Sequence, residues 1–194
     1  MIGAGAVAGY TAAEVAKAEG VVLTALADPS AARASELAAA HNVTAVYANA
    51  AELLEHGNVD AVYIAVPNAL HAPLALQSLE AGKHVLLDKP FALNAAQAST
   101  VVQVAEHAKR VLMLGMNTRF HANVQRARAL FEQGIFGPIY HVKAQWRRRS
   151  GIPRIGSWFT HKASAGGGAL LDIGVHMLDA SLYILNNFEP LSVS

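Results

Sequence analysis

Short runs of β-branched and aliphatic residues alternate with longer stretches rich in Ala and Leu up to about residue 114. This alternation is typical of βαβ units, in which helices connect parallel strands. After a stub at residues 1–2, the pattern predicts strands over Val21–Ala27, Val46–Tyr47, Ala61–Val66, His84–Leu87 and Arg110–Leu114. One helix is expected from the glycine-rich turn to about Glu19, and another over Ala31–His41. A third is expected to end at Gly82, and a fourth to run from a cap at Asn94 to about Ala108. We therefore predict an α/β domain with a doubly wound, Rossmann-type parallel sheet.

The rhythm changes after Gly115. The expected elements are then a helix near Asn123–Gln133, a longer strand over Ile139–Arg148, and an apolar helix over about Ala169–Leu185. No further βα repeat occurs in this part of the chain. We therefore expect a Rossmann domain over residues 1–119, with a truncated first strand, followed by a partial α+β domain over residues 120–194.

Composition and charge narrow the class of protein. Hydrophobic residues make up 53% of the 194 residues and charged residues 15%, which suits a sizeable core and argues against disorder. A formal net charge of +1 gives no field that would recruit nucleic acid or an anionic membrane. The uncharged stretch over residues 61–79 holds two prolines, which suit a strand, a loop and a helix better than a membrane span. Because the chain has no cysteine, it fits a reducing cytoplasm, and we expect a soluble cytoplasmic protein without nucleic-acid or membrane partners.

A glycine-rich turn near the N-terminus matches a dinucleotide-binding pattern. Gly3, Gly5 and Ala8 fit the spacing G-x-G-x-x-[G/A], where the second Gly lets the backbone approach a pyrophosphate and the small third residue lets helix pack on strand. The N-terminus of the following helix supplies amide donors for the phosphate. Asp28 ends the next strand 23 residues after Gly5, close to the about 20 expected of an acid that binds ribose hydroxyls. The plainer alternative is that Asp28 only caps the following helix.

Asp28 also bears on the choice between the two nicotinamide cofactors. Its carboxylate would repel a 2′-phosphate, and no Arg follows within four residues. We therefore expect NAD rather than NADP.

Two polar clusters follow predicted strands, at the edge where open α/β sheets place their ligands. In Asp88-Lys89-Pro90, the Lys can hydrogen-bond a substrate oxygen and stabilise a developing alkoxide, or it can be an ordinary surface Lys beside a turn. In Pro67-Asn68-x-x-His71, the His either starts a helix or lies on the cofactor side.

Asp172 and His176 stand four residues apart on the predicted apolar helix, so they share one helix face. The other residues from Ala169 to Leu178 are apolar or Gly, and two titratable groups in such surroundings must be partnered or functional. A His oriented by a carboxylate can serve as a general base near neutral pH. The alternatives are a purely structural His–Asp hydrogen bond and a metal site, although no third ligand stands at motif spacing.

Taken together, these residues resemble the Gfo/Idh/MocA family, named after glucose–fructose oxidoreductase and inositol dehydrogenase. The landmarks that match, in order, are Gly3-x-Gly5 with Asp28-Pro29, Pro67-Asn68-x-x-His71, Gly82-Lys83-His84-Val85-x-x-Asp88-Lys89-Pro90, and Gly166-Gly167-Gly168 through Asp172-x-x-x-His176. The resemblance covers essentially the whole chain. It implies an NAD-dependent oxidoreductase that transfers a hydride between a nicotinamide cofactor and a secondary hydroxyl of a sugar, sugar derivative or inositol.

The resemblance also implies roles for individual residues. Lys89 is expected to contact substrate and nicotinamide ribose, with a cis bond to Pro90. His176 is the expected acid/base, and Asp172 its orienting and substrate-binding partner, so these two and Lys89 are the expected catalytic residues. Lys89, Arg119, Asp172 and His176 are expected to bind substrate. The expected cofactor-binding residues are Gly3, Gly5, Val7, Ala8, Asp28, Val66, Pro67, Asn68, His71, Asp88 and Lys89; no metal ion is expected. Four arginines either bind an anionic substrate group or form a solvated strand end: Arg147, Arg148, Arg149 and Arg154.

The chain departs from the family pattern in two ways. Members usually carry Glu where Asp88 stands, and they have a full first strand and a complete open antiparallel sheet of several strands in the second domain. Here we expect that sheet to be incomplete, with Ile139–Arg148 as its clear strand. A homo-oligomer is expected of a full-length relative, whereas the state of this chain stays open. Two other functions also stay open, namely a non-catalytic NAD-binding fragment and NAD-assisted glycoside cleavage.

Overall fold

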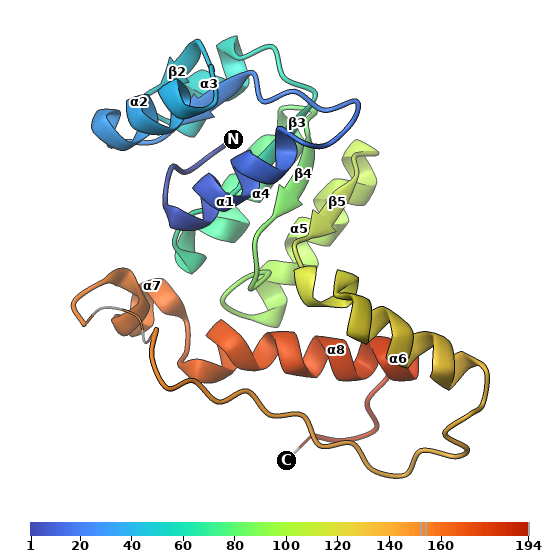
Figure 1. The fold of residues 1–194 in the computed structure, drawn as a ribbon. Coiled ribbons are helices and arrows are strands. Elements are labelled where there is room, and N and C mark those ends of the chain that lie inside the picture. The colour runs from blue at the N-terminus through green and yellow to red at the C-terminus, as the bar shows by residue number, and fades with distance from the viewer. Residues whose placement is uncertain (152, 154, 194) are drawn as a thin grey trace. The chain divides into compact units, whose positions relative to one another are not determined.

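The computed structural model describes residues 1–151, 153 and 155–193, and they form two compact units (Figure 1). Unit 1 comprises Met1–Gly115 together with Ala163–Gly166. Unit 2 comprises Met116–Lys162 and the described residues from Gly167 onward. The division falls after Gly115, slightly before the boundary at residue 119 expected from the sequence.

The strands of unit 1 form a parallel sheet. They are β1 (Ala25–Ala27), β2 (Ala45–Tyr47), β3 (Ala61–Ile64), β4 (His84–Leu87) and β5 (Leu112–Leu114). β1 pairs with β2, and β3, β4 and β5 pair in that order, all in parallel. Ile2 joins the two groups, because it bridges to Ala27 on one side and to Ile64 on the other. The order is therefore β2, β1, residues 1–2, β3, β4, β5, which confirms the predicted doubly wound arrangement.

Helices connect successive strands of this sheet. They are α1 (Ala6–Val15), α2 (Ala31–Ala40), α3 (Ala50–His56), α4 (His71–Glu80) and α5 (Ala95–Ala108), with a short 3₁₀ turn η1 (Asn68–Leu70) before α4. Three helices begin at side-chain caps, because Ser30, Asn49 and Asn94 each accept a hydrogen bond from the amide three residues on. The cap at Asn94 was predicted, whereas α3 and its cap at Asn49 were not.

Two apolar clusters show that the helices cover both faces of the sheet. One cluster includes Ala8 of α1, Leu26 of β1 and Ala38 of α2. The other contains side chains from α3, α4 and α5 together with Val62 and Ile64 of β3. Alternate β3 residues therefore enter opposite layers, as the period of two in a strand requires.

The strand expected over Val21–Ala27 is shorter in the structure. Only Ala25–Ala27 is paired, and Val21 and Val22 are exposed. The strand is short because β2 and residue 2 are its neighbours, and they offer partners only to residues 25–27. The first helix also ends earlier than expected, at Val15 rather than near Glu19.

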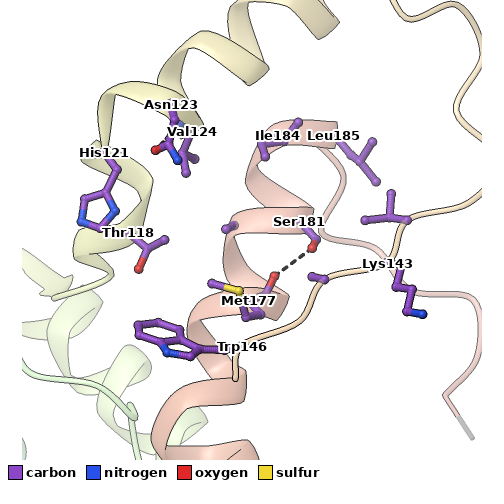
Figure 2. Close-up of a pocket in the computed structure, with 13 residues that line it drawn as sticks. Thr118, His121, Asn123, Val124, Lys143, Trp146, Met177, Ser181, Ile184 and Leu185 are labelled. Atoms are coloured by element: carbon purple, nitrogen blue, oxygen red, sulfur yellow. Dashed lines mark hydrogen bonds between the residues drawn. The ribbon is translucent and has the colours of Figure 1, made fainter. Parts of the chain in front are cut away.

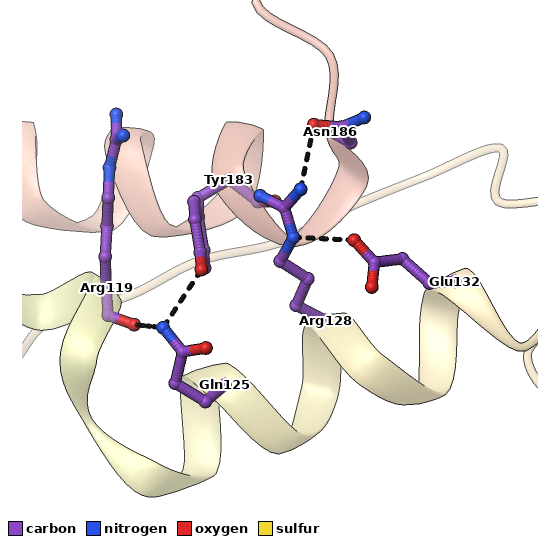
Figure 3. A network of polar contacts seen from close by, with 6 residues as sticks. All are labelled: Arg119, Gln125, Arg128, Glu132, Tyr183 and Asn186. Atoms are coloured by element: carbon purple, nitrogen blue, oxygen red, sulfur yellow. Dashed lines mark hydrogen bonds and ion pairs between the residues drawn. The ribbon is translucent and has the colours of Figure 1, made fainter.

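Unit 2 is built around two helices that lie side by side, α6 (Ala122–Glu132) and α8 (Val175–Leu185) (Figure 1). The shorter elements are η2 (Asn117–Phe120), η3 (Trp158–Thr160), the α7 turn (Lys162–Ala165), which passes into unit 1, and a π-helical turn, η4 (Leu170–Gly174), directly before α8. Polar side chains tie α6 to α8 (Figure 3). Arg128 donates to the Tyr183 carbonyl and the Asn186 side chain, and Gln125 donates to the Tyr183 hydroxyl.

The predicted strand over Ile139–Arg148 is wrong for this structure, in which the segment is extended but irregular. A strand needs a neighbour that accepts and donates its backbone hydrogen bonds. No other segment of unit 2, within the described residues, runs beside it in β-pairing. The antiparallel sheet expected for this unit is accordingly not observed in that part of the chain.

The stretch Lys162–Leu185 is long and apolar enough to cross a membrane by length and composition, since an 18-residue window within it has a mean hydropathy of 1.4. It also carries Asp172, His176 and Asp179, which are costly inside a bilayer. The stretch is therefore weak evidence for a membrane span.

Candidate functional site

The glycine turn of unit 1 depends on a close backbone approach at Gly3. This residue has a φ of +99°, and a Cβ added there would lie 2.2 Å from the Ala65 carbonyl oxygen. Its amide also donates to the Ala27 carbonyl at 2.8 Å. Gly3 thus lets the N-terminal segment pass between β1 and β3, which a larger residue would prevent.

Gly5 caps α1 in a different way. Its backbone is extended, and a Cβ added there would meet nothing within 4 Å, so packing within the protein does not demand a glycine. No side chain caps α1, and Gly5, Ala6 and Val7 are exposed. Ala8, by contrast, is fully buried and packs the helix onto the sheet. The open space with its uncapped amides fits the pyrophosphate of a dinucleotide.

Asp28 is buried at the end of β1 and holds the glycine turn. Its Oδ2 accepts from the Ala4 amide at 2.8 Å, and its Oδ1 accepts from the Ser30 amide at 2.8 Å. Burial acts to raise the pKa of Asp28, but the hydrogen bonds from Ser30, Ala4 and Arg33 outweigh it and leave that pKa below its usual value. Ser30, not Asp28, caps α2, so the plainer alternative for Asp28 does not describe its contacts.

Arg33 is a residue that the sequence argument missed. Its Nη2 donates to Asp28 Oδ1 at 2.9 Å, and its side chain is 58% exposed. Arg33 is the fifth residue after Asp28, and the first turn of α2 brings it back over the strand end. The charge that a cofactor ribose would meet is therefore that of an Asp28–Arg33 pair.

The two polar residues of the motif at residues 67–71 bond to the backbone around them. Asn68 is buried, and its Nδ2 donates to the carbonyl of Ala165, 97 residues away. His71 is 1% exposed and lies between the carbonyl oxygens of Pro90 and Val66. The motif therefore supports the ends of β3 and β4, a role that spacing along the chain did not reveal.

Asp88 and Lys89 follow β4 at the same edge of the sheet. The Lys89 amide donates to Asp88 Oδ1 at 2.9 Å, and both side chains are half-buried. Burial raises the pKa of Asp88, while the Lys89 amide and the charges of Lys89 and His71 act to lower it. The Lys89–Pro90 bond is cis, as expected.

In unit 2, His176 lies at the start of α8 and is 8% exposed. Its Nδ1 is 3.3 Å from Thr118 Oγ1, and its ring is 5.9 Å from that of Trp146. Thr118 was not predicted, because it is 58 residues away from His176 and has no local signal. A hydroxyl at Nδ1 orients the ring of His176.

Asp172 lies in the π-helical turn rather than in the α-helix, and it is half-buried. The wider turn changes the i to i+4 geometry on which the pairing with His176 was predicted, so that pairing stays a prediction. π-Helical turns occur frequently at functional sites.

Arg119 has a partner that the sequence argument did not foresee. Its guanidinium forms two hydrogen bonds with the carboxylate of Asp179 and lies 5.3 Å from the Tyr183 ring centroid. The hydrogen bond to Asp179 raises the pKa of Arg119. The pair holds η2 against α8, and the expected contact of Arg119 with substrate stays a prediction.

A pocket of about 380 Å³ lies between η2, α6, α8 and the segment over residues 142–146 (Figure 2). Thr118 and Trp146, which contact His176, are among its lining residues. Val124, Met177 and Ile184 make much of the wall apolar, and the Ser181 hydroxyl is bonded to the Met177 carbonyl. Such a lining offers a sugar few polar partners, so we do not assign it as the sugar site.

The predicted site residues divide between the units. Lys89 and the predicted cofactor-binding residues belong to unit 1, whereas Arg119, Asp172 and His176 belong to unit 2. Arg147, Arg148 and Arg149 are exposed, and Arg154 lies outside the described residues. Among those described, no group of three or more His, Asp or Glu side chains could hold a metal ion.

The chain matches two family descriptions in succession. Residues 1–116 match "Oxidoreductase family, NAD-binding Rossmann fold", and residues 124–194 match "GFO/IDH/MocA C-terminal domain". The first match alone covers more than half of the chain.

Curated relatives include oxidoreductases named for sugars and others named for a different substrate, trans-1,2-dihydrobenzene-1,2-diol. The chain is 36% identical over 163 residues to D-glucoside 3-dehydrogenase of Escherichia coli (strain K12), covering 84% of this chain and 46% of that protein. It is 38% identical over 137 residues to dTDP-3,4-didehydro-2,6-dideoxy-alpha-D-glucose 3-reductase of Streptomyces violaceoruber, covering 70% and 39%. The chain spans less than half the length of these two relatives.

Solved structures share the fold. An NAD-binding protein from Listeria innocua superposes with a TM-score of 0.84 at 32% identity, covering 94% of this chain and 53% of that one. GenD2 from gentamicin A biosynthesis, in complex with NAD, superposes with a TM-score of 0.81 at 27% identity, covering 95% and 52%.

Proposed function

This chain belongs to the Gfo/Idh/MocA family of NAD-binding oxidoreductases, and we propose that it oxidises a secondary hydroxyl of a sugar, sugar derivative or inositol. The observation that carries the proposal is the open, uncapped start of α1 beside the buried carboxylate of Asp28. This arrangement fits a dinucleotide in a chain whose relatives include a D-glucoside 3-dehydrogenase.

The residues of unit 1 would hold the cofactor. The amides at the start of α1 would bind the pyrophosphate, Gly5 would allow its close approach, and Asp28 would accept hydrogen bonds from ribose hydroxyls. The turns after β3 and β4 would hold the nicotinamide half. Bound NAD supplies the acceptor for the hydride that leaves the carbinol carbon.

His176 is the proposed base of the reaction. Thr118 holds its Nδ1, so that Nε2 takes the proton from the substrate hydroxyl as the carbon loses its hydride. Lys89 is the proposed donor of a hydrogen bond that would stabilise negative charge developing on a substrate oxygen. Asp172 binds the substrate and orients His176.

The test has two stages. NAD is first titrated into the protein and its dissociation constant measured by intrinsic fluorescence or calorimetry. NADH formation is then followed with a panel of glucosides, free sugars and inositols. We expect saturable NAD binding and absorbance from NADH with at least one panel member. NAD binding without NADH from any of them would contradict the proposal, and release of free sugar without NADH would indicate cofactor-assisted glycoside cleavage instead.

We also propose a cytoplasmic location for the protein, whereas the oligomeric state of this chain stays open. The absence of cysteine is compatible with a reducing compartment. Fractionation of cells tests the location, and light scattering of the purified protein measures the oligomeric state.

A further inference from the structure

His71 is held in a way that a neutral histidine does not explain. Its Nδ1 lies 2.6 Å from the Pro90 carbonyl oxygen, and its Nε2 lies 3.0 Å from the Val66 carbonyl oxygen. Both are hydrogen-bond distances, and the ring is 1% exposed. The two partners are backbone carbonyls, which can only accept.

A neutral imidazole carries one N–H donor and one bare nitrogen. With two acceptors around the ring, one tautomer would set the Nδ1 lone pair against the Pro90 oxygen, and the other would set the Nε2 lone pair against the Val66 oxygen. Only the imidazolium form has an N–H for each carbonyl. Charge-assisted hydrogen bonds of this kind are stronger than neutral ones.

A buried charge also needs compensation. The charge of His71, like that of Lys89, acts to lower the pKa of the Asp88 carboxyl group at the end of β4. Among the interactions that the structure records for His71, Asp88 supplies the opposite charge.

We propose that His71 is a doubly protonated positioning residue that clamps the turn after β3, through Val66, to the turn after β4, through Pro90. The two strands are parallel neighbours, so the clamp joins their carboxyl ends. Because Pro90 directly follows Lys89, the clamp also sets the backbone from which Lys89 extends. The inference deepens the proposed function, on which it rests for its consequence in binding the nicotinamide half of NAD.

The charge state is tested by spectroscopy, without substrate or cofactor. The protein is labelled with ¹⁵N-histidine, and the resonances of His71 among the nine histidines are identified by their loss in His71→Gln. At about pH 7.5, above the usual titration range of histidine, we expect both ring nitrogens of His71 to show bonded protons. One protonated and one bare nitrogen at that pH would overturn the proposal.

The positioning role is tested with a pair of variants. His71→Phe keeps a ring but removes both donors, whereas His71→Gln keeps two N–H donors on one neutral nitrogen. We expect His71→Phe to weaken NAD binding about tenfold, equivalent to the loss of one ordering hydrogen bond. Binding of ADP, which lacks the nicotinamide half of NAD, should stay within about twofold. His71→Gln should recover part of the NAD affinity.

His107→Phe and His107→Gln are matched controls, because His107 is exposed on α5. Equal loss of ADP and NAD affinity in His71→Phe would show a general fold defect and overturn the positioning role. Unchanged NAD affinity in His71→Phe would overturn it as well. If the wild-type protein binds neither NAD nor ADP, the proposed function fails, while the ¹⁵N spectrum still decides the charge of His71.

Discussion

The two units hold their site residues by different means. In unit 1, the polar side chains at the sheet edge bond to backbone groups: Asp28 to the amides of Ala4 and Ser30, Asn68 to the Ala165 carbonyl, and His71 to two carbonyls. In unit 2, side chains bond mainly to side chains, as in Arg119 with Asp179 and Thr118 with His176. The backbone of a sheet is fixed by its ladder, so it makes a more rigid support than a second side chain does.

The two units also differ in how much apolar surface they bury. Unit 1 contains two clusters of buried apolar side chains, one on each face of its sheet. Helix α6 of unit 2 has no buried residue, and its contacts with α8 include Arg128 lying over the ring of Tyr183. Burial of apolar side chains therefore stabilises unit 1. In unit 2, cation–π contacts and ion pairs hold α6 and α8 together to a larger extent.

The largest expected effect comes from the residue proposed for chemistry. Replacing His176 with Ala removes the base, and we expect turnover to fall by about 10²–10⁴-fold. The affinity for NAD should stay nearly unchanged, since the cofactor-binding residues belong to unit 1. Steady-state rates with the best panel substrate, together with an NAD titration, measure both. Wild-type turnover in this variant would remove His176 from the mechanism.

The next largest effect is a loss of stability that we expect from a substitution at Gly3 but not from one at Gly5 of the same turn. Gly3→Ala places a Cβ 2.2 Å from the Ala65 oxygen at a positive φ, so we expect a loss of about 2–4 kcal/mol in unfolding free energy. Gly5→Ala meets nothing in the protein and should leave stability almost unchanged while weakening NAD binding. Urea denaturation and NAD titration of both variants test the contrast. Equal destabilisation by the two substitutions would mean that the turn is not held as described.

A smaller effect is expected from the ion pair of unit 2. The Arg119 and Asp179 side chains are 32% and 11% exposed, so replacing Arg119 with Leu leaves a largely buried carboxylate without its partner. We expect a loss of about 1–3 kcal/mol, less than for a fully buried pair. Hydrogen exchange should increase in α8 and stay unchanged in β3 and β4. Lys17→Ala, which removes an exposed pair of unit 1, is the control and should change stability by less than about 0.5 kcal/mol.

The smallest effect concerns acid stability. The pKa of Asp28 in the folded protein lies below its usual value of 3.8, so its ionised form contributes stability that is fully present above the unfolded pKa. This contribution is lost as the pH falls through the folded pKa. Asp28→Asn should therefore lower stability at neutral pH and flatten its pH dependence below about pH 4. Thermal unfolding as a function of pH measures this, and an unchanged slope in the variant would show that Asp28 does not contribute.

Local patterns were sufficient for much of unit 1. The apolar runs predicted its strands, and the spacing of Gly3, Gly5 and Asp28 predicted a dinucleotide turn that the structure builds around the hydrogen bond from Ala4 to Asp28. Arg33 was missed because its contact with Asp28, five residues earlier, forms only once the first turn of α2 is in place. Thr118 was missed because no local pattern marks a residue that meets His176 only through folding.

Unit 2 was less predictable for a physical reason. The alternation over residues 139–148 suits a strand, but a strand forms only where another segment pairs with it, and sequence periodicity says nothing about that partner. The i to i+4 spacing of Asp172 and His176 assumed an α-helix, whereas residues 170–174 form a π-helical turn. The missing strand arises from tertiary context that overrides local preference, whereas the pairing of Asp172 with His176 stays a prediction.

The sequence by itself determined the parallel α/β architecture of unit 1, the glycine turn, and the family to which the chain belongs, because these follow from period, spacing and residue type within short segments. Only the tertiary structure decided which partner each polar side chain meets: Arg33 for Asp28, Thr118 for His176, and two carbonyls for His71. The physical reason is that hydrogen-bond partners are set by the three-dimensional positions of groups far apart in the chain. Those partners, in turn, set the charge and orientation of each functional group.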